Sequence, residues 1–235
     1  KKQKALWEEG FDEEAGKYEG SKWGKYVCAP EIFFKILEKA KDKLVPLKKI
    51  ANVRRGFTTG ANEFFYLTED QIKKWGIEKE FWMHKENGKW VPNYIIKSPR
   101  ECKSIVVEPK DLKYRVAFKH TDRKQLRGTN VLKYIKWGEG MGFHRRPTCT
   151  SRRNWWDLGV RRAARINANY LMNDVGRAFI GNYWASDDFQ EIHTSKFVEP
   201  FLNSTLFWLF QNVEGRTSFG GGLLKLQTYE FERLL

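Results

Sequence analysis

Apolar residues recur at helical spacing in two long stretches of the chain. The first begins at Pro30, which suits the first turn of a helix, and ends before Pro46, which cannot continue one. Its apolar positions are Ile32, Phe33, Ile36, Leu37, Ala40 and Leu44. This pattern predicts an amphipathic helix over about 30–44. The second stretch, FLNSTLFWLFQNVEG at 201–215, predicts a core helix that is closed by Gly215.

Two shorter segments carry helix end signals. In TEDQIKKWG, Thr68 and Gln71 have the spacing of a capping box, and Gly76 follows the last turn. NVLKYIKWG, which ends at Gly138, fits a helix of about two turns. The sequence therefore predicts a helix at each place.

Other apolar residues fall into brief runs that are typical of strands. EFFYL at 63–67 is one, and the segment 89–118 contains WVPNYII, SIVVE and YRVAF, bounded by Pro, Lys or Asp. Residues 178–193 predict a pair of strands around a Ser-Asp-Asp turn. Helices and strands do not alternate regularly, which favours the α+β class. We expect a single domain with a curved, mostly antiparallel mixed sheet and several flanking helices.

Composition indicates a globular protein with excess positive charge. Of 235 residues, 41% are hydrophobic, and 43 Lys and Arg oppose 29 Asp and Glu, which leaves a formal charge of +14. Such a charge attracts polyanions, with nucleic acid the first candidate and an anionic membrane the second. The most apolar run, 201–210, has about half the length of a membrane span and contains polar residues. We therefore expect no membrane partner.

The remaining features of the composition bear on the setting of the chain. Cys28, Cys102 and Cys149 lie far apart, in no arrangement that binds a metal or pairs neatly, so we expect no metal and a reducing cytoplasm. The segment 1–20 has mixed charge and no period, and we expect a linker or peripheral arm there. Because Lys1 rather than Met opens the chain, we expect it to be part of a longer protein.

Positive charge is concentrated between Arg145 and Arg177. This region has eight arginines and no lysine, and only Asp157 and Asp174 oppose them. Arginine bonds phosphate or guanine through two parallel N–H groups, whereas lysine acts as a point charge. HRRPTCTSRRNWWDLG at 144–159 therefore predicts a loop that presents arginines and hydroxyl groups and is anchored by at least one buried indole. Structural ion pairing of the arginines is the alternative.

A second candidate contact is the turn within VRRGFTTGANEFFYL at 53–67. Gly56 and Gly60 permit positive φ, and Thr58 and Thr59 offer N–H and hydroxyl groups to a phosphate or a base edge. The strand-like tail would hold the turn rigidly. On spacing alone, an ordinary hairpin turn is equally well supported.

Several blocks of the chain occur in an order that points to a known family. They are SKWGKYVCAPEIFFKILE, LKKIANVRRGFTTGANEFFYL, PNYIIKSPRE, LKYIKWGE, RPTCTSRRNWWDLG and FLNSTLFWLFQNVEGRTSFGGGLLKL. Together they resemble the C-terminal target recognition region of adenine-specific N6 DNA methyltransferases, specifically the TaqI-like specificity domain of type II methylases and fused restriction-modification enzymes. PLKKIANVRRG also resembles the start of the recognition domains in type I specificity subunits, an alternative of related function.

The resemblance implies that 21–235 form a DNA target recognition domain opposite a methyltransferase catalytic domain in the same or a partner chain. Double-stranded DNA is the implied partner, and S-adenosylmethionine is the implied cofactor of the parent catalytic domain. The matching segments are Arg54–Asn62, Lys97–Glu101, Arg145–Trp156 and Gly215–Leu226. The residues that we expect to contact DNA are Arg54, Arg55, Thr58, Thr59, Lys97, Arg145, Arg146, Ser151, Arg152, Arg153, Arg216 and Lys225.

Catalytic motifs are missing from the chain itself. Adenine methylation needs an Asn/Asp-Pro-Pro-Tyr/Phe motif and a glycine-rich S-adenosylmethionine site, but VPNY at 91–94 has the wrong order and FGGGLL follows a predicted helix. We therefore expect no cofactor and no methyl transfer in this chain alone. Glu108 and Lys110 lack the other carboxylates of a nuclease site. An RNA-binding module is a further alternative, although the RNA-recognition strand motif with its paired aromatics is absent from the sequence.

Overall fold

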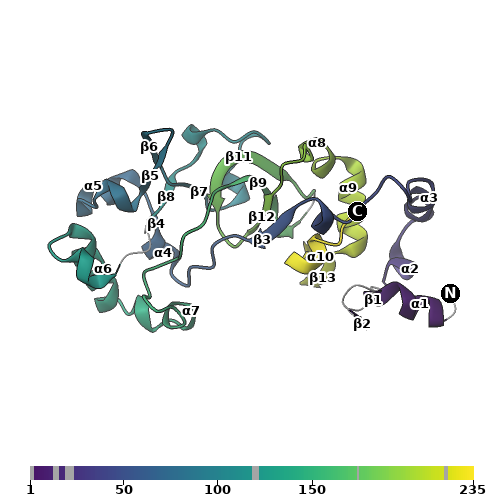
Figure 1. Ribbon diagram of the computed structural model, residues 1–235, viewed down its shortest axis with the longest axis horizontal. Coiled ribbons are helices and arrows are strands. Elements are labelled where there is room, and N and C mark those ends of the chain that lie inside the picture. The colour runs from purple at the N-terminus through teal and green to yellow at the C-terminus, as the bar shows by residue number, and fades with distance from the viewer. Residues whose placement is uncertain (1–2, 13–15, 19–23, 118–121, 174, 220–221) are drawn as a thin grey trace. The chain divides into compact units, whose positions relative to one another are not determined.

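The computed structural model describes residues 3–12, 16–18, 24–117, 122–173, 175–219 and 222–235 (Figure 1). These residues form two compact units. We call residues 52–170 and 177–195 the sheet unit, and residues 1–51, 171–176 and 196–235 the helical unit. The predicted boundaries, an arm over 1–20 and a recognition domain over 21–235, stay predictions.

A seven-stranded sheet organises the sheet unit (Figure 1). Its strands, in spatial order, are β3 (Asn52–Arg55), β12 (Phe189–His193), β9 (Ala164–Asn169), β11 (Ala178–Ala185), β7 (Tyr94–Ile96), β8 (Tyr114–Val116) and β4 (Tyr66–Leu67). Neighbouring strands run antiparallel, except that β11 and β7 are parallel. The register of β11 against β9 shifts between Ile180 and Tyr183, and such a bulge bends and twists a strand. The predicted α+β class with a curved, mostly antiparallel mixed sheet is confirmed.

Short helices and a hairpin complete the sheet unit. The hairpin joins β5 (Met83–Glu86) and β6 (Lys89–Pro92) through Asn87 and Gly88, which both have positive φ, as a two-residue hairpin turn requires. The helices are α4 (Asn62–Phe65), α5 (Glu69–Trp75), α6 (Asn130–Gly140) and α7 (Pro147–Thr150). The predicted capping box of α5 is present, and Gly76 after the helix is left-handed.

An aromatic cluster holds these helices together. The Phe64 ring lies 4.7 Å from the Tyr134 ring and 4.6 Å from the Trp155 indole, centroid to centroid. Trp155 and Trp156 are both buried, so the predicted indole anchor of the basic segment is confirmed. Helix α6 continues to Gly140 rather than ending at Gly138. Gly138 lies within the helix, and close packing explains the glycine, because a Cβ there would sit 2.6 Å from the Phe64 ring.

The helical unit contains the chain's first and last described elements. Its strands are β1 (Phe11–Asp12), β2 (Lys17–Tyr18), β10 (Leu171–Met172), β13 (Arg216–Phe219) and β14 (Leu223–Lys225), of which β10, β14 and β13 form one small sheet. Its helices are α1 (Gln3–Gly10), α2 (Lys25–Cys28), α3 (Glu31–Lys39), α8 (Glu199–Leu202), α9 (Thr205–Glu214) and α10 (Thr228–Phe231). Phe33 of α3 packs edge-on against Phe210 of α9, and Phe207 packs similarly against Phe231.

Several predicted elements need correction. EFFYL is not one strand: residues 62–65 form the turn of α4, because this geometry buries the consecutive rings of Phe64 and Phe65 together, whereas a strand would point them to opposite faces. The helix predicted over 201–215 is interrupted. The Ser204 side chain accepts a hydrogen bond from the Phe207 N–H and begins α9 as a separate helix.

Three further differences concern boundaries and pairing. The helix predicted over 30–44 ends at Lys39. SIVVE contributes only an isolated bridge, Val106 to Ile180, among the described residues. The strands predicted in 178–193 are present as β11 and β12, but both pair with β9, which lies between them.

Candidate nucleic-acid interface

The turn that follows β3 is fixed by backbone contacts. Gly56 donates its N–H to the Phe189 carbonyl, and Phe57 donates to the Ala185 carbonyl. A Cβ at Gly56 would lie 2.1 Å from the Ser186 carbonyl oxygen, so only glycine fits at this approach. The turn is therefore held against the strands of the sheet rather than forming a free hairpin.

The second half of the turn is fixed by side chains. Thr59 is buried, its hydroxyl donates to the Asn62 side chain and accepts from the Ala61 N–H, and this leads directly into α4. Gly60 has φ +76°, and a Cβ there would lie 2.7 Å from Thr148. Of the two glycines for which the sequence suggests positive φ, Gly60 has it and Gly56 does not; Gly56 is needed instead because of its close approach to Ser186.

Two arginines of the segment 143–157, which we call the basic loop, bind the turn. Arg152 donates from Nη2 to the Thr58 carbonyl at 2.7 Å and from Nη1 to the Trp155 carbonyl at 3.3 Å. Arg146 donates to the Gly60 carbonyl at 3.1 Å and to the Glu63 carboxylate at 2.6 Å. The structure therefore brings the two predicted segments together, and these two guanidinium groups, with the Cys149 thiol that donates to the Thr59 carbonyl, form the connection.

The side chains that remain exposed differ from those that make this connection. Thr58, Arg145, Ser151 and Arg153 are exposed. The Arg145 and Arg153 guanidinium groups make no hydrogen bond or ion pair with any residue that the structure describes. The Ser151 hydroxyl donates to the Thr148 carbonyl and keeps its lone pairs toward solvent. This part of the interface can offer cations and hydroxyl groups to a ligand.

The two arginines of β3 lie in different environments. Arg54 donates from Nε to the Glu191 carboxylate at 2.6 Å and from Nη2 to the Arg162 carbonyl at 2.6 Å. The Glu191 side chain has no exposed surface, so Arg54 neutralises a buried charge. Arg55 is more exposed, lies 3.5 Å from the Asp187 carboxylate, and stacks on the Tyr170 ring at 4.2 Å.

The other predicted contact residues lie apart from the basic loop in sequence. The Lys97 ammonium group lies 4.4 Å from the centre of the Tyr114 ring. In the helical unit, Arg216 donates to the buried Glu230 carboxylate at 2.6 Å. Lys225 lies on β14 and pairs with Arg216 of β13. The DNA-contact role of all twelve predicted residues stays a prediction.

Electrostatics distinguish the paired carboxylates. The Arg146 guanidinium holds the pKa of Glu63 below its ordinary value. Burial raises the pKa of Glu191, and the neighbouring Arg54 opposes that rise. Burial also raises the pKa of Asp188, which neighbours Asp187. Glu63 therefore contributes its ion pair over the whole neutral range, whereas at Glu191 burial outweighs the stabilising effect of Arg54 on the charged form.

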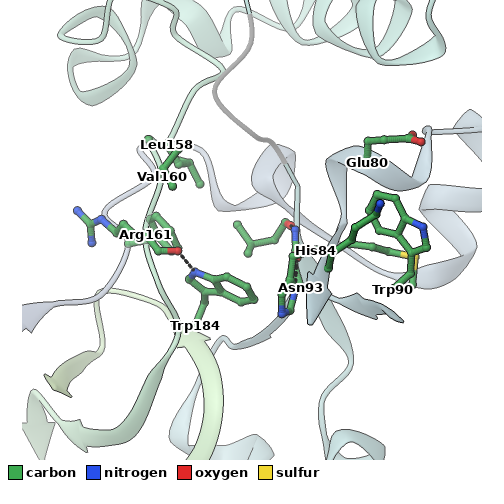
Figure 2. A pocket seen from close by; sticks show the side chains of 13 residues that line it. Glu80, His84, Trp90, Asn93, Leu158, Val160, Arg161 and Trp184 are labelled. Carbon is green, nitrogen blue, oxygen red and sulfur yellow. Dashed lines mark hydrogen bonds between the residues drawn. The ribbon is translucent and has the colours of Figure 1, made fainter. Parts of the chain in front are cut away.

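Sequence reasoning missed a pocket in the sheet unit. Its volume is about 500 Å³. Figure 2 shows Trp184, Leu158, Val160 and Arg161 on one side and His84, Trp90 and Glu80 on another. Asn87-Gly88, a strong hairpin signal, could have located the β5–β6 wall, but nothing local in the sequence indicates that residues near 158 and 184 meet it.

The comparisons with known proteins bear on what this surface serves. A sequence model of the family described as "Type II methyltransferase M.Eco57I, C-terminal domain" matches residues 20–235. This chain belongs to that family. Membership in the M.Eco57I C-terminal domain family confirms the resemblance inferred from the sequence blocks, and it favours a type II system over the type I alternative.

A solved structure shares the fold of this M.Eco57I-type domain. The chain is similar to the type IIG restriction endonuclease BpuSI, with a TM-score of 0.51 and 12% sequence identity, over 90% of this chain and 26% of that one. This chain therefore spans about a quarter of the length of that enzyme. The comparison with curated proteins found no match. Across the described residues, every helix is too short or too polar to cross a bilayer.

Proposed function

We propose that this chain binds double-stranded DNA in a sequence-specific manner, as the target recognition domain of a larger adenine-N6 DNA methyltransferase or fused restriction-modification protein. The catalytic domain, in the same or a partner chain, would bind S-adenosylmethionine and transfer the methyl group. The family to which the chain belongs supports a role beside such a catalytic domain. The role of this chain is to choose the site.

One observation carries the proposal. Arg152 anchors the Thr58 carbonyl, and the exposed Arg153 follows it directly in the chain. Arg146 anchors Gly60 in the same way, beside the exposed Arg145. Each anchored arginine thus fixes the backbone beside an exposed arginine. This reduces the conformational entropy that is lost when the exposed guanidinium binds a phosphate or a base edge.

This arrangement assigns different roles to the predicted residues. Thr58, Arg145, Ser151 and Arg153 are the groups that we propose contact DNA. Arg54, Arg146 and Arg152 are positioning residues, because each guanidinium already donates two hydrogen bonds within the protein. Arg55 and Lys97, which lie on aromatic rings, can extend the cationic surface.

The test compares nucleic acids and variants at one salt concentration. The protein is titrated with a duplex DNA of random sequence, with a duplex enriched by selection, and with single-stranded RNA of the same length. We expect the selected duplex to bind best, and the Arg145→Ala/Arg153→Ala variant to lose roughly tenfold or more of that affinity. Lys89→Ala, an exposed cation on β6, is the matched control.

Two outcomes would contradict the proposal. Preference for RNA over both duplexes would indicate an RNA-binding module. Equal affinity for random and selected duplexes would remove the recognition role. Adenine methylation is tested separately, by incubating the full protein that carries this chain with S-adenosylmethionine and the selected duplex, and by mapping the modified base.

A further inference from the structure

The pocket in the sheet unit adjoins the candidate interface. Phe57 lines the pocket and precedes Thr58 of the turn. Arg161, another lining residue, donates from Nη1 to the Arg55 carbonyl at 3.1 Å, and its guanidinium lies 4.8 Å from the centre of the Phe57 ring. The pocket therefore lies directly beside the turn, and a group of a ligand bound at the turn can reach it.

Two indoles and the His84 ring form part of the walls of the pocket. The Trp184 indole is fixed by donation of its N–H to the Arg161 carbonyl at 3.0 Å, and the His84 ring meets it edge-on at 5.0 Å (Figure 2). Trp90, on the hairpin, has the ammonium groups of Lys79 and Lys85 at 5.0 and 5.5 Å from its ring centre. Flat walls of this kind accept a planar ring, and the adjacent cations favour a ring that carries an anionic group.

Two polar side chains of the pocket, His84 and Glu80, can offer acceptors. The His84 Nδ1 lies 3.0 Å from the Asn93 side-chain oxygen, while the Asn93 amide donates to the Val116 carbonyl at 3.3 Å. The Asn93 oxygen can only accept, so His84 donates from Nδ1, and a ring that carries this one proton has Nε2 as an acceptor. The Glu80 carboxylate also lines the pocket, and it has no hydrogen bond to any described residue.

We propose that this pocket binds a nucleotide whose base is unpaired, with the base against Trp90 and Trp184 and the phosphate near Lys85. The source is either an extrahelical nucleotide of bound DNA, which rests on the proposed function, or a free mononucleotide. Because Glu80 and His84 offer acceptors, bases with an exocyclic amino group bind more tightly than thymine.

The experiment measures the two sources separately. In the first arm, the protein is titrated with dAMP, dCMP, dGMP, dTMP and deoxyribose 5-phosphate. In the second, it is titrated with a fully paired duplex and with the same duplex carrying one unpaired 2-aminopurine nucleotide, whose fluorescence falls when it stacks on an indole. We expect dTMP and the sugar phosphate to bind most weakly, and the unpaired 2-aminopurine to be quenched.

The variants distinguish the pocket from the rest of the surface. Trp90→Ala should weaken binding of the unpaired nucleotide by roughly five- to a hundredfold, with the paired duplex unchanged within about twofold. Glu80→Gln replaces an exposed side chain, should leave the fold intact, and should reduce the preference over dTMP. Lys89→Ala, on the same hairpin but outside the pocket, should behave as the unaltered protein.

The possible failures are distinguishable. If the paired duplex binds while the unpaired base is unquenched and the mononucleotides bind no better than the sugar phosphate, the pocket proposal is wrong and the proposed function stands. If mononucleotides bind with the expected base preference but no duplex does, the pocket proposal stands and the proposed function is wrong. An effect of Lys89→Ala equal to that of Trp90→Ala would also overturn the pocket proposal.

Discussion

Neighbouring arginines of the basic loop have opposite roles. Arg152 donates hydrogen bonds to the Thr58 and Trp155 carbonyls, whereas Arg153 is exposed and makes no hydrogen bond or ion pair with a described residue. Composition could locate this loop, because four of the eight arginines between Arg145 and Arg177 lie in it and few acids are nearby. It could not separate the two roles, because the partners of Arg152 include a carbonyl 94 positions away in the chain.

This difference predicts opposite effects of two alanine substitutions. Arg152→Ala should lower the free energy of unfolding by about 1–3 kcal/mol, because two carbonyls lose a charged donor. Arg153→Ala should leave stability within about 0.5 kcal/mol and weaken DNA binding instead. Urea unfolding and duplex titration of both variants give the comparison. Equal stability losses in the two variants would contradict the assignment.

The buried Glu191 carboxylate predicts a pH dependence of stability. Burial raises the pKa of Glu191 above the ordinary 4.5. The carboxyl group therefore stays protonated in the folded protein at pH values where it has lost its proton in the unfolded chain. Its contribution to stability is therefore full below about pH 4.5 and is lost as the pH rises through the folded-state pKa. The stability of the protein minus that of Glu191→Gln should fall over this interval, measured by urea unfolding at several pH values. A difference that rises with pH would contradict the cause assigned.

At the scale of elements, the sequence predicted helix ends correctly where residues close in the chain determine their geometry. The Thr68 capping box and the left-handed Gly76 formed as predicted, because both depend on residues within one or two turns. The prediction of one strand for EFFYL was wrong. Phe64 and Phe65 pack against Tyr134 and Trp155, which lie far away in the sequence and so outside the local pattern. Tertiary packing outweighed the local preference there.

The turn after β3 gives a prediction about one glycine. Gly56→Ala should destabilise the sheet unit by about 1–3 kcal/mol or more, because the added Cβ would meet the Ser186 carbonyl oxygen at 2.1 Å. Thermal unfolding measures the loss. Gly140→Ala is the control, since a Cβ there has nothing within 4 Å, and we expect no loss of stability. A Gly56→Ala protein as stable as this control would show that the turn yields without cost.

At the scale of the whole molecule, the fold class followed from the sequence but the strand order did not. The absence of regular alternation indicated an α+β protein, and the seven-stranded sheet agrees. The order of its strands places β9 between β11 and β12, and neither that insertion nor the parallel pairing of β11 with β7 has a local signature. The pocket depends on the same long-range order, because that pairing brings Trp184 of β11 and Asn93 beside β7 to its walls. Contacts of this kind are set by packing across the sheet rather than by periodicity.

The formal charge of +14 predicts a strong salt dependence of DNA binding. If about five phosphates are neutralised, affinity should fall roughly several hundredfold between 50 and 200 mM salt, because each contact contributes a slope of about 0.9. Arg145→Ala/Arg153→Ala should reduce the slope by about 1.8 if both residues contact phosphates. If they contact bases, the slope should stay unchanged while the preference among sequences relaxes. Titrations of both proteins at four salt concentrations, with random and selected duplexes, separate these cases. A double variant with the same slope and the same sequence preference as the unaltered protein would show that the exposed arginines of the basic loop do not face the DNA.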